Sequence, residues 1–517
     1  MLIKTFSATV VGIDAVIVTV EAHASLGYDF TLVGLPDTAV KEGHDRINSA
    51  IHVCGLHMPQ RQMTINMSPA DIKKEGAAFD LTLAVAELAA VEQIKCEKLK
   101  DYLILGELSL DGHLRPVRGC LPIALAAKQN QFKGIILPAD NASEAAVVNG
   151  LNVYGFTHLT QVVDFLNGNL QTTPVNVDAA TLLSTSTTPN DVDFRDVRGQ
   201  FQARQAIEIA AAGGHNIIMV GPPGAGKSMI AKRIPTILPP MTLDEALETT
   251  KIYSVAGQLN RKKGGGLNET LITQRPFRSP HHTITEVTMV GGGNNPHPGE
   301  VSMAHNGVLF LDELPEFKRT TLEVLRQPLE DGHISVARNR LTIDYPSNFM
   351  LVAAMNPCPC GHYGDHDHEC TCTPYQRHRY LSRISGPLLD RIDIQCSIQS
   401  VQYAELSSKT DGESSADIRA RVVKARMIQT KRFAGTDVHC NAQMTPAMVR
   451  QFCVLDQASE QTIRIAMTKQ GLSARAYDRI LKVARTIADL DEAENIAVKH
   501  IAQAISFRQL DRADWGE

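Results

Sequence analysis

The sequence predicts an α/β protein built in three consecutive blocks, and three observations support this. Apolar runs of strand length alternate with Ala-rich helical stretches through residues 1–168, and again from residue 193 to about 400. Residues 169–192 are rich in Thr, Ser and Pro and lack periodicity, which predicts a linker between these two blocks. Helical periodicity then continues through 401–517, which predicts a third block made of helices.

In the first block, the apolar runs predict strands and the Ala-rich stretches predict helices. The expected strands are 16–22, 31–36, 62–69, 102–110, 134–140 and 151–156, and the expected helices are 81–93 and 121–129. In the third block the expected helices are 415–433, 446–456, 459–470, 474–491 and 498–510.

Composition narrows the class of protein. The formal net charge of −5 shows no overall basic excess, so any nucleic-acid binding must use a local stripe or a pore. No apolar run reaches the length of about 18 residues that a membrane span needs, and the alternation at 16–22 indicates a strand instead of a signal peptide. Ten cysteines in 517 residues do not indicate a secreted disulfide scaffold. We therefore expect a cytoplasmic protein.

A nucleotide site opens the second block. Residues 215–238 have the pattern of a buried strand, a Gly-rich turn and a helix, and the turn GPPGAGKS matches the phosphate-binding loop G-x-x-x-x-G-K-[ST] in full. Lys227 is expected to reach the β- and γ-phosphates, and Ser228 to bind Mg²⁺. The sequence thus predicts ATP and Mg²⁺ as cofactors, bound by Gly221, Pro222, Pro223, Gly224, Ala225, Gly226, Lys227 and Ser228.

Two further apolar strands end in polar residues. GVLFLDEL, residues 307–314, ends in Asp312, expected to hold the Mg²⁺ through water, and Glu313, expected to polarise the attacking water. NFMLVAAMNP, residues 348–357, ends in Asn356, which is placed to orient that water; the alternative is a turn Asn before Pro357. Together with the loop, these carboxylates predict an ATPase.

A later arginine is a candidate for catalysis across a subunit boundary. Arg391 follows a helical stretch in ISGPLLDRIDI, and we interpret it as a finger for the γ-phosphate of a neighbouring subunit. The alternative is a local ion pair to Asp390 or Asp393.

The stretch CPCGHYGDHDHECTC, residues 358–372, predicts a metal site. Four cysteine ligands are enough for a closed tetrahedral Zn²⁺ site, and a histidine from 362, 366 or 368 could replace one sulfur. The alternative is a loop of free thiols. Because a closed site has no open position for catalysis, we expect zinc to brace the loop between the strand-end Asn and the arginine. The predicted ligands are Cys358, Cys360, Cys370 and Cys372.

These motifs together resemble the YifB/ComM family of magnesium-chelatase-like AAA+ ATPases over essentially the whole chain. The residues that carry the resemblance are 193–200, 221–228, 275–283, 290–317, 355–361 and 384–394. The resemblance implies a homo-hexameric, ATP-dependent DNA helicase that promotes branch migration and heteroduplex extension on incoming DNA in natural transformation. Its implied partners are single-stranded and branched DNA and the recombinase machinery. An alternative is a magnesium-chelatase-like ATPase that remodels a protein or metal-insertion partner.

The resemblance also implies roles for residues. Gln200 would lie near the adenine, Asn356 would be the sensor, Arg391 the finger, and Arg475 the second sensor on a C-terminal helical lid spanning 401–517. Residues 281–300 resemble the helix-2 insert of this clade and 330–346 its pre-sensor hairpin, with Arg338 and Arg340 at a tip suited to phosphate contact in a ring pore. The alternative for both segments is a solvated surface loop.

The first block resembles a Lon-type peptidase domain, but with two departures. Where Lon has its nucleophilic serine this chain has Ala78, and where Lon has its catalytic lysine it has Leu121. A Ser–Lys dyad needs a hydroxyl and an amine. We therefore predict an inactive pseudo-peptidase domain over 1–168 that serves as a scaffold.

Overall fold

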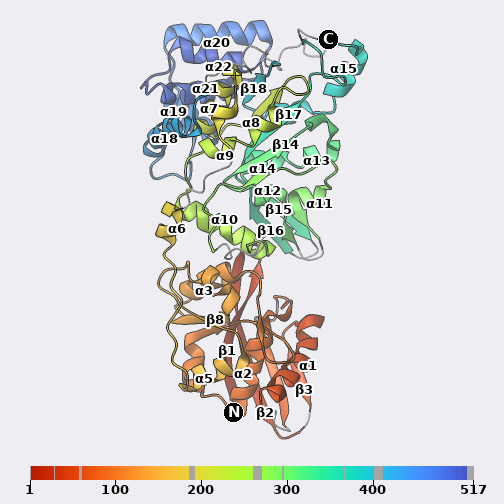
Figure 1. Cartoon of the computed structure of the whole chain (residues 1–517), viewed down its shortest axis with the longest axis vertical. Helices are drawn as coiled ribbons and strands as arrows, with labels where there is room; N and C mark the ends of the chain where they lie inside the picture. Colours follow the sequence, from red (N-terminus) through yellow and green to blue (C-terminus); the bar gives the residue numbers. More distant parts are fainter. Residues whose placement is uncertain are drawn as a thin grey trace. The chain divides into compact units, whose positions relative to one another are not determined.

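The computed structural model describes residues 2–27, 29–57, 61–185, 192–259, 270–293, 296–338, 341–365, 368–400 and 412–508. Internal contacts divide the chain into two compact units (Figure 1). The first comprises Met1–Ser186 with Leu243–Thr273, and the second comprises Thr187–Thr242 with Gln274–Glu517. Residues 243–273, which the sequence places inside the ATPase block, therefore belong by their contacts to the first unit.

The first unit is built on a mixed seven-stranded sheet of order β3-β4-β2-β1-β5-β8-β9. A hairpin of β1 and β2 forms its centre, and β5, β8 and β9 continue it in parallel. The strands are β1 (Leu2–Val11), β2 (Asp14–Ser25), β3 (Phe30–Val33), β4 (Gln62–Ser68), β5 (Tyr102–Ile104), β8 (Gly134–Pro138) and β9 (Asn152–Phe156). All but β1, which the sequence did not predict, overlap the apolar runs expected to form strands. A separate two-stranded ribbon pairs β6 (Glu107–Leu108) with β7 (Leu114–Arg115).

Helices cover this sheet, and all residues of the most apolar one are buried. They are α1 (Thr38–Val53), α2 (Asp80–Ala90), α3 (Cys120–Gln129), α4 (Ala139–Ala145), α5 (Leu159–Asn167) and α6 (Ala179–Thr185), with the 3-10 turns η1 (Ala77–Phe79) and η2 (Cys96–Asp101). Helix α6 lies inside the segment predicted as a linker. That segment also packs on the unit, since Val175 bridges to Val153 and Val177 contacts the core.

Helix α10 (Leu243–Ala256) is the part of the first unit that comes from beyond the phosphate-binding loop. Leu247 packs against the buried cluster that contains Leu121. The Ser254 hydroxyl donates to the buried Glu144 carboxylate at 2.5 Å, and Lys251 pairs with Asp14 at 2.7 Å. The chain therefore enters the first unit at residue 243 and leaves it after 273, between two strands of the second unit's sheet.

The second unit has a five-stranded sheet of order β11-β14-β17-β10-β18, in which every pairing is parallel. The strands are β10 (Ile217–Val220), β11 (Phe277–Arg278), β14 (Val308–Leu311), β17 (Met350–Met355) and β18 (Ile394–Ser397). Strands β10, β14 and β17 are buried throughout, as their continuous apolar runs predict for a parallel sheet covered on both faces. The α/β class with a parallel sheet is thereby confirmed.

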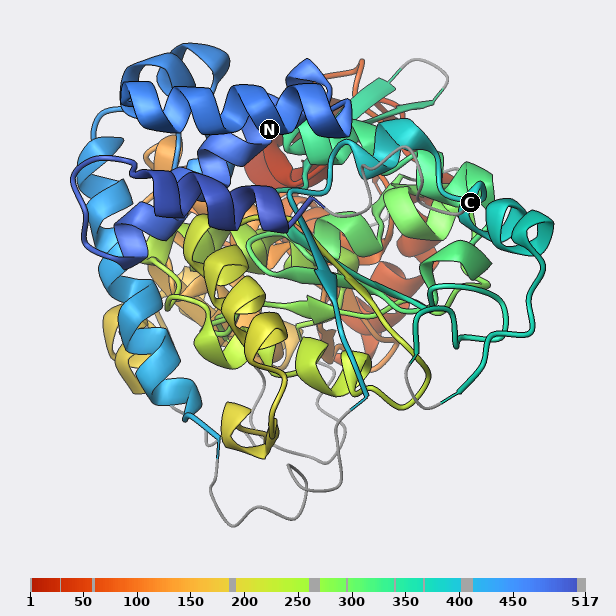
Figure 2. The ribbon, with the colours of Figure 1, turned by 90° about the horizontal axis from the view of Figure 1, so that it is seen from above.

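Alternate residues of these strands feed two different cores. Ile217, Phe310 and Val352 join a cluster with α7 (Phe201–Gly213) and the C-terminal helices, whereas Ile218 and Leu311 join one on the other face. Figure 2 shows α7, in yellow, beside the blue C-terminal helices. The second face is covered by α11 (Glu286–Val290), α12 (Glu300–Met303), α13 (Arg319–Glu323), α15 (Pro374–Leu381) and α16 (Gly386–Leu389).

The C-terminal helices begin and end close to their predicted bounds. They are α18 (Ser415–Arg432), α19 (Pro446–Phe452), α20 (Gln457–Gln470), α21 (Ala474–Leu490) and α22 (Val498–Ser506), and side chains of Ser, Thr or Asp cap the first four. Among the helices that the structure describes, none combines the length and apolar character needed to cross a bilayer.

Two ribbons project from the second unit's sheet region. β15 (His333–Arg338) pairs with β16 (Leu341–Pro346), and β12 (Gly291–Gly292) with β13 (His297–Pro298). The buried Tyr345 of the first ribbon donates its hydroxyl to the Pro296 carbonyl beside the second, at 2.8 Å. The segment 281–300, which resembles the helix-2 insert, thus contains the short helix α11 and a ribbon that is hydrogen-bonded to its neighbour.

Candidate functional site

Three neighbouring strands carry the predicted nucleotide residues to one edge of the sheet. β10 pairs with β17, and β17 pairs with β14, all in parallel register. The carboxyl ends of parallel strands lie at the same edge, which is where α/β sheets bind ligands. The phosphate-binding loop follows β10, Asp312 follows β14, and Asn356 follows β17.

The phosphate-binding loop turns tightly because two glycines permit it. A Cβ atom at Gly221 would lie 2.2 Å from the Ile398 carbonyl oxygen, so no larger residue fits where the loop leaves β10. Gly226 has a φ of +84°, which favours glycine, and it precedes helix α8 (Lys227–Ala231). The loop therefore ends on the backbone N–H groups of a helix start, the usual environment for a phosphate.

Lys227 connects the phosphate-binding loop to Asn356, the residue that follows β17. Its ammonium group donates to the carbonyls of Gly221 at 2.6 Å and Pro222 at 2.8 Å, and to the side-chain oxygen of Asn356 at 3.1 Å. Burial lowers the pKa of this lysine, and Asp312 opposes that shift. The structure thus brings the predicted phosphate lysine and the predicted sensor into direct contact.

Ser228 and Asp312, the two residues predicted to hold Mg²⁺, are also in contact. The serine hydroxyl donates to Asp312 Oδ2 at 2.5 Å, and Asp312 Oδ1 accepts from the backbone N–H of Glu313 at 3.0 Å. Both oxygen ligands therefore converge next to the loop, in the arrangement that P-loop proteins use for the metal.

Glu313 has an unusual backbone and a partner that sequence reasoning missed. Its φ is +53°, uncommon for a residue other than glycine, and 60% of its side chain is exposed. Oε2 lies 3.5 Å from Nδ1 of His282. His282 belongs to the segment 275–283 that carries the family resemblance, and its paired histidines were the signal that could have identified it.

Gln200 also contacts the phosphate-binding loop. It has a φ of +56° at the start of α7, and its amide donates to the carbonyls of Ala225 at 3.5 Å and Gln399 at 2.6 Å. The residue that resemblance associates with the adenine thus contacts the loop and the end of β18.

Arg391 is buried and forms an ion pair that neither sequence alternative named. Its guanidinium donates to the Pro387 carbonyl at 2.6 Å and pairs with Glu330, whose side chain is 58% exposed, while Arg391 itself is 7% exposed. Glu330 is the penultimate residue of helix α14 (Arg326–Asp331), three positions before the start of strand β15. The candidate finger is therefore tied to the base of the β15–β16 ribbon.

The two aspartates beside Arg391 have other partners. Asp390 lies 3.8 Å from the exposed Arg475, and buried Asp393 pairs with Arg479. Asp393 also accepts from the backbone N–H of Asn216 at 3.0 Å. Burial would raise the pKa of Asp393, but Arg479 and a neighbouring histidine lower it well below its ordinary range. This network fixes the backbone of the Arg391 segment to the strand that precedes the phosphate-binding loop.

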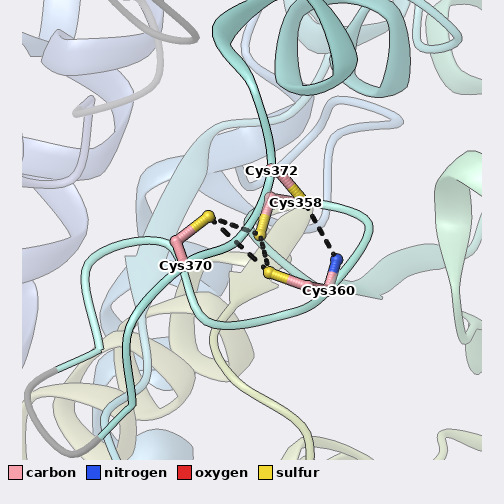
Figure 3. A group of neighbouring side chains, drawn as sticks. All are labelled: Cys358, Cys360, Cys370 and Cys372. Carbon is pink, nitrogen blue, oxygen red and sulfur yellow. Dashed lines mark hydrogen bonds between the residues drawn. The ribbon is translucent and has the colours of Figure 1, made fainter.

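The four predicted zinc ligands form one cluster (Figure 3). Sulfur–sulfur distances are 3.3 Å for Cys358–Cys360, 3.7 Å for Cys358–Cys370 and 3.6 Å for Cys360–Cys370. A tetrahedral ion with Zn–S bonds of about 2.3 Å has sulfurs about 3.8 Å apart, whereas a disulfide needs about 2.05 Å. Cys372 completes the set, with its sulfur accepting from the Cys360 N–H at 3.4 Å. The cluster is compatible with zinc.

The cysteine loop contacts the phosphate-binding loop itself, which the sequence did not predict. Gly361 has a φ of +88°, and a Cβ atom there would lie 2.5 Å from Pro223 Cδ. The expected brace between the strand-end Asn and Arg391 thus also rests on a residue of the predicted nucleotide site.

The predicted DNA contacts are placed only in part. Arg338 is the last residue of β15 and pairs in register with Leu341, but its side chain is outside the described part of the structure. Arg340 lies outside the described residues altogether.

The two positions predicted to lack a Lon-type dyad differ in burial: Leu121 lies in the core of the first unit, and Ala78 is half-buried. Leu121, on α3, is fully buried, and its N–H donates to Glu144 at 2.9 Å. Ala78, in η1, accepts a backbone hydrogen bond from Gly106 at 2.8 Å. Neither side chain supplies a hydroxyl or an amine.

Comparison with known proteins gives this architecture its class. Residues 193–406 match the family model "Magnesium chelatase, subunit ChlI", 20–141 match "Subunit ChlI of Mg-chelatase", and 412–508 match "Magnesium chelatase, subunit ChlI C-terminal". These are magnesium-chelatase-like AAA+ proteins, a class that indicates an ATPase using ATP and Mg²⁺.

Relatives over the full length narrow the class. The chain is 45% identical to the Escherichia coli protein YifB over 97% of this chain and 96% of that one. It is 43% identical to the competence protein ComM of Haemophilus influenzae, over 98% and 97%. A magnesium-chelatase 38 kDa subunit from Cereibacter sphaeroides is 26% identical over only 32% of this chain and 52% of its own length. The chain belongs to the YifB/ComM family of magnesium-chelatase-like proteins.

Proposed function

We propose that this protein is an ATP-driven, ring-forming DNA helicase that promotes branch migration and extends heteroduplex when incoming DNA recombines. The observation that carries the proposal is the full-length likeness to a protein named for competence, joined to the contacts of Lys227 with Asn356 and of Ser228 with Asp312 at the predicted nucleotide site. The likeness to a competence protein supports DNA as the substrate, and the nucleotide-site residues support ATP as the energy source.

The contacts at the strand ends support specific roles for the nucleotide residues. Lys227 would exchange its carbonyl partners for the β- and γ-phosphates, and Ser228 and Asp312 would hold Mg²⁺, which neutralises charge on the phosphates. Glu313 would orient the attacking water, with His282 holding the carboxylate when it is not so engaged. Asn356, already bonded to Lys227, would report on the γ-phosphate.

We propose a hexameric ring in which Arg391 acts on the neighbouring subunit's nucleotide. To reach the nucleotide of the neighbouring subunit, the Arg391 side chain would have to break its ion pair with Glu330 at the base of the β15–β16 ribbon. Since Arg338 ends strand β15 of that ribbon, nucleotide state in one subunit would bias the ribbon, and with it the predicted DNA contact, in the next. Contacts between arginine side chains and DNA phosphates do not depend on the base sequence, as branch migration requires.

The remaining parts would support this motor. We propose that zinc at the four cysteines stiffens the loop that rests on Pro223 through Gly361. The first unit would be an inactive peptidase-like scaffold, since Ala78 and Leu121 offer neither nucleophile nor base. The helices from 412 to 508 would be the lid that carries Arg475 as second sensor.

A second candidate is an ATPase that remodels a protein or metal-insertion partner. The descriptions of all three matched family models favour it, because each names a magnesium-chelatase subunit. Against it, the chelatase subunit aligns with only 32% of this chain, whereas the competence protein aligns with 98%.

The two candidates differ in what stimulates hydrolysis. Steady-state ATPase is measured on the full chain alone, with single-stranded DNA, with duplex and with a mobile four-way junction, and junction products are followed on gels. We expect the rate of ATP hydrolysis to rise with single-stranded or branched DNA. We also expect junctions to be separated into their duplex products only when ATP is hydrolysed. Glu313→Gln is the matched control, because it should bind ATP and DNA yet process no junction. ATPase that is indifferent to all three DNAs, with no strand movement, would reject the helicase.

A further inference from the structure

A second group of metal-binding side chains lies in the same loop as the cysteines but uses different residues. His362, Asp365 and His368 each offer a nitrogen or oxygen atom, and these three atoms lie within 4.8 Å of one another. Nδ1 of His362 lies 3.1 Å from Asp365 Oδ2, and Nδ1 of His368 lies 3.3 Å from the same oxygen. Both imidazoles thus lie within 3.3 Å of the same carboxylate oxygen.

These spacings match those of ligands around one small cation. Imidazole nitrogen and carboxylate oxygen bind Zn²⁺ at about 2.0–2.2 Å, so two such ligands of a tetrahedral ion lie about 3.3–3.5 Å apart. Both measured nitrogen–oxygen distances lie within about 0.2 Å of the lower value. The ring centroids of the histidines are 4.8 Å apart with an interplanar angle of 36°, so the rings converge without lying flat on each other.

The three side chains differ in their exposure. The Asp365 side chain is only 5% exposed, whereas both histidines are more exposed. The histidines are 30% and 67% exposed, so an ion can reach the site from solvent and would keep one coordination position open. A neutral imidazole is a good ligand for zinc, copper and nickel, and a carboxylate completes a mixed nitrogen–oxygen set.

We propose that His362, Asp365 and His368 form a second divalent transition-metal site. It is separate from the four-cysteine site and binds metal more weakly. Three ligands and an open position predict the weaker binding. The bound ion would connect residues 362 and 368 within the loop bounded by Cys360 and Cys370. It would thereby stiffen the segment after Gly361, the residue that packs against Pro223. The proposal does not depend on the ATPase assignment.

Metal counting tests the site directly. Full-length protein is stripped with a chelating resin, titrated with Zn²⁺ by calorimetry and checked by elemental analysis. We expect two equivalents per chain, one tight and one weaker. The double variant His362→Gln/His368→Gln should retain only the tight one. Asp365→Asn, which keeps shape and hydrogen bonding but loses the anionic ligand, should weaken the second equivalent by at least the roughly 10–100-fold that loss of an outer-shell partner costs.

Cobalt separates the two sites spectroscopically. The first equivalent of Co²⁺ should give the intense near-ultraviolet charge-transfer band of thiolate ligation, and the second only weak visible bands. The double variant should lose the weak bands alone. His378→Gln, an exposed histidine on α15 outside the cluster, is the matched control and should bind both equivalents.

Two outcomes would overturn the proposal. One is a parent protein that binds a single equivalent, all of it at thiolates. The other is a double variant that binds two equivalents with the parent's affinities, which would leave the three side chains as a hydrogen-bonded cluster.

Discussion

Replacing Arg391 by alanine should suppress ATP hydrolysis while leaving the fold intact, and the structure supplies the size of both effects. Arg391 is 7% exposed, but its partner Glu330 is 58% exposed and stays hydrated when the arginine is removed. An ion pair with one partner in solvent contributes about 0–1 kcal/mol. Losing the buried methylene stem costs about 2 kcal/mol more. A total of about 2–3 kcal/mol is smaller than the stability of a typical domain, about 5–15 kcal/mol.

The effect on catalysis should be larger. Arginine fingers contribute about 10³–10⁵ in kcat, equivalent to about 4–7 kcal/mol of transition-state stabilisation. We therefore expect Arg391→Ala to lower kcat by at least about 100-fold and to change ATP affinity only a few-fold. The measurements are steady-state ATPase, binding of a fluorescent ATP analogue, and particle mass to verify that rings form.

Mixing subunits tests whether the arginine acts across a boundary. Arg391→Ala and Glu313→Gln are each expected to be inactive alone. In mixed rings, an intact Arg391 faces an intact Glu313 at roughly one boundary in four, so activity should reappear. Recovery of no activity, with mixed rings demonstrated, would argue for a role within one subunit.

A second arginine controls for damage to the fold. Arg479 pairs with Asp393, whose side chain is 1% exposed, so Arg479→Ala leaves a buried charge without its partner and should cost about 3–5 kcal/mol. Its melting temperature should fall well below that of Arg391→Ala. If Arg391→Ala hydrolyses ATP at the parent's rate under conditions where rings are present, the finger assignment is wrong.

Four other predictions address the remaining parts. Lys227→Ala should lose ATP binding because it removes the charge facing the phosphates, whereas Glu313→Gln should bind ATP and hydrolyse it slowly; equal binding by both variants in a nucleotide filter assay would contradict this. Elemental analysis of protein purified without chelator should find about one tightly held zinc per chain at the four cysteines, and finding no transition metal would leave them as free thiols. The double change Arg338→Ala/Arg340→Ala should abolish DNA-stimulated hydrolysis and reduce the salt dependence of DNA binding, with basal ATPase retained; unchanged junction processing would place the DNA contact elsewhere. The pKa of Asp393 is lower in the folded state than its unfolded value of about 3.9. The ionised carboxylate therefore stabilises the fold fully above that unfolded value, and this stabilisation is lost as the pH falls toward the pKa of the folded state. Asp393→Asn should be less stable than the parent at pH 7, and its melting temperature should change less with pH below about 5.

Local patterns predicted most elements of this fold. Strands β10, β14 and β17 are continuous apolar runs and lie where those runs are, and α21 follows its helical periodicity from a Ser cap. The contacts among the loop, Asp312 and Asn356 were also foreseeable, because residues that follow parallel strands meet at one edge of the sheet. The order of the strands in the sheet, in contrast, cannot be predicted from any single apolar run.

Contacts between distant segments were not predicted. The sequence offered Asp390 or Asp393 as partners of Arg391 because they are adjacent, but the structure pairs Arg391 with Glu330, 61 residues earlier. The contact of Gly361 with Pro223 likewise joins two loops that follow different strands. Such contacts depend on which surfaces pack together, and a short motif carries no information about that.

The sequence by itself determined which motifs this protein carries: the phosphate-binding loop, the strand-end carboxylates, the four clustered cysteines and the family to which they point. These are short-range features, because backbone conformation and ligand type depend on a few neighbouring residues. Only the tertiary structure decided that α10 belongs to the first unit, that Arg391 is tied to the base of a ribbon, and that His362, Asp365 and His368 converge. The physical reason is that burial of apolar surface is non-directional, so it selects partners by the shape of the whole fold and not by position along the chain.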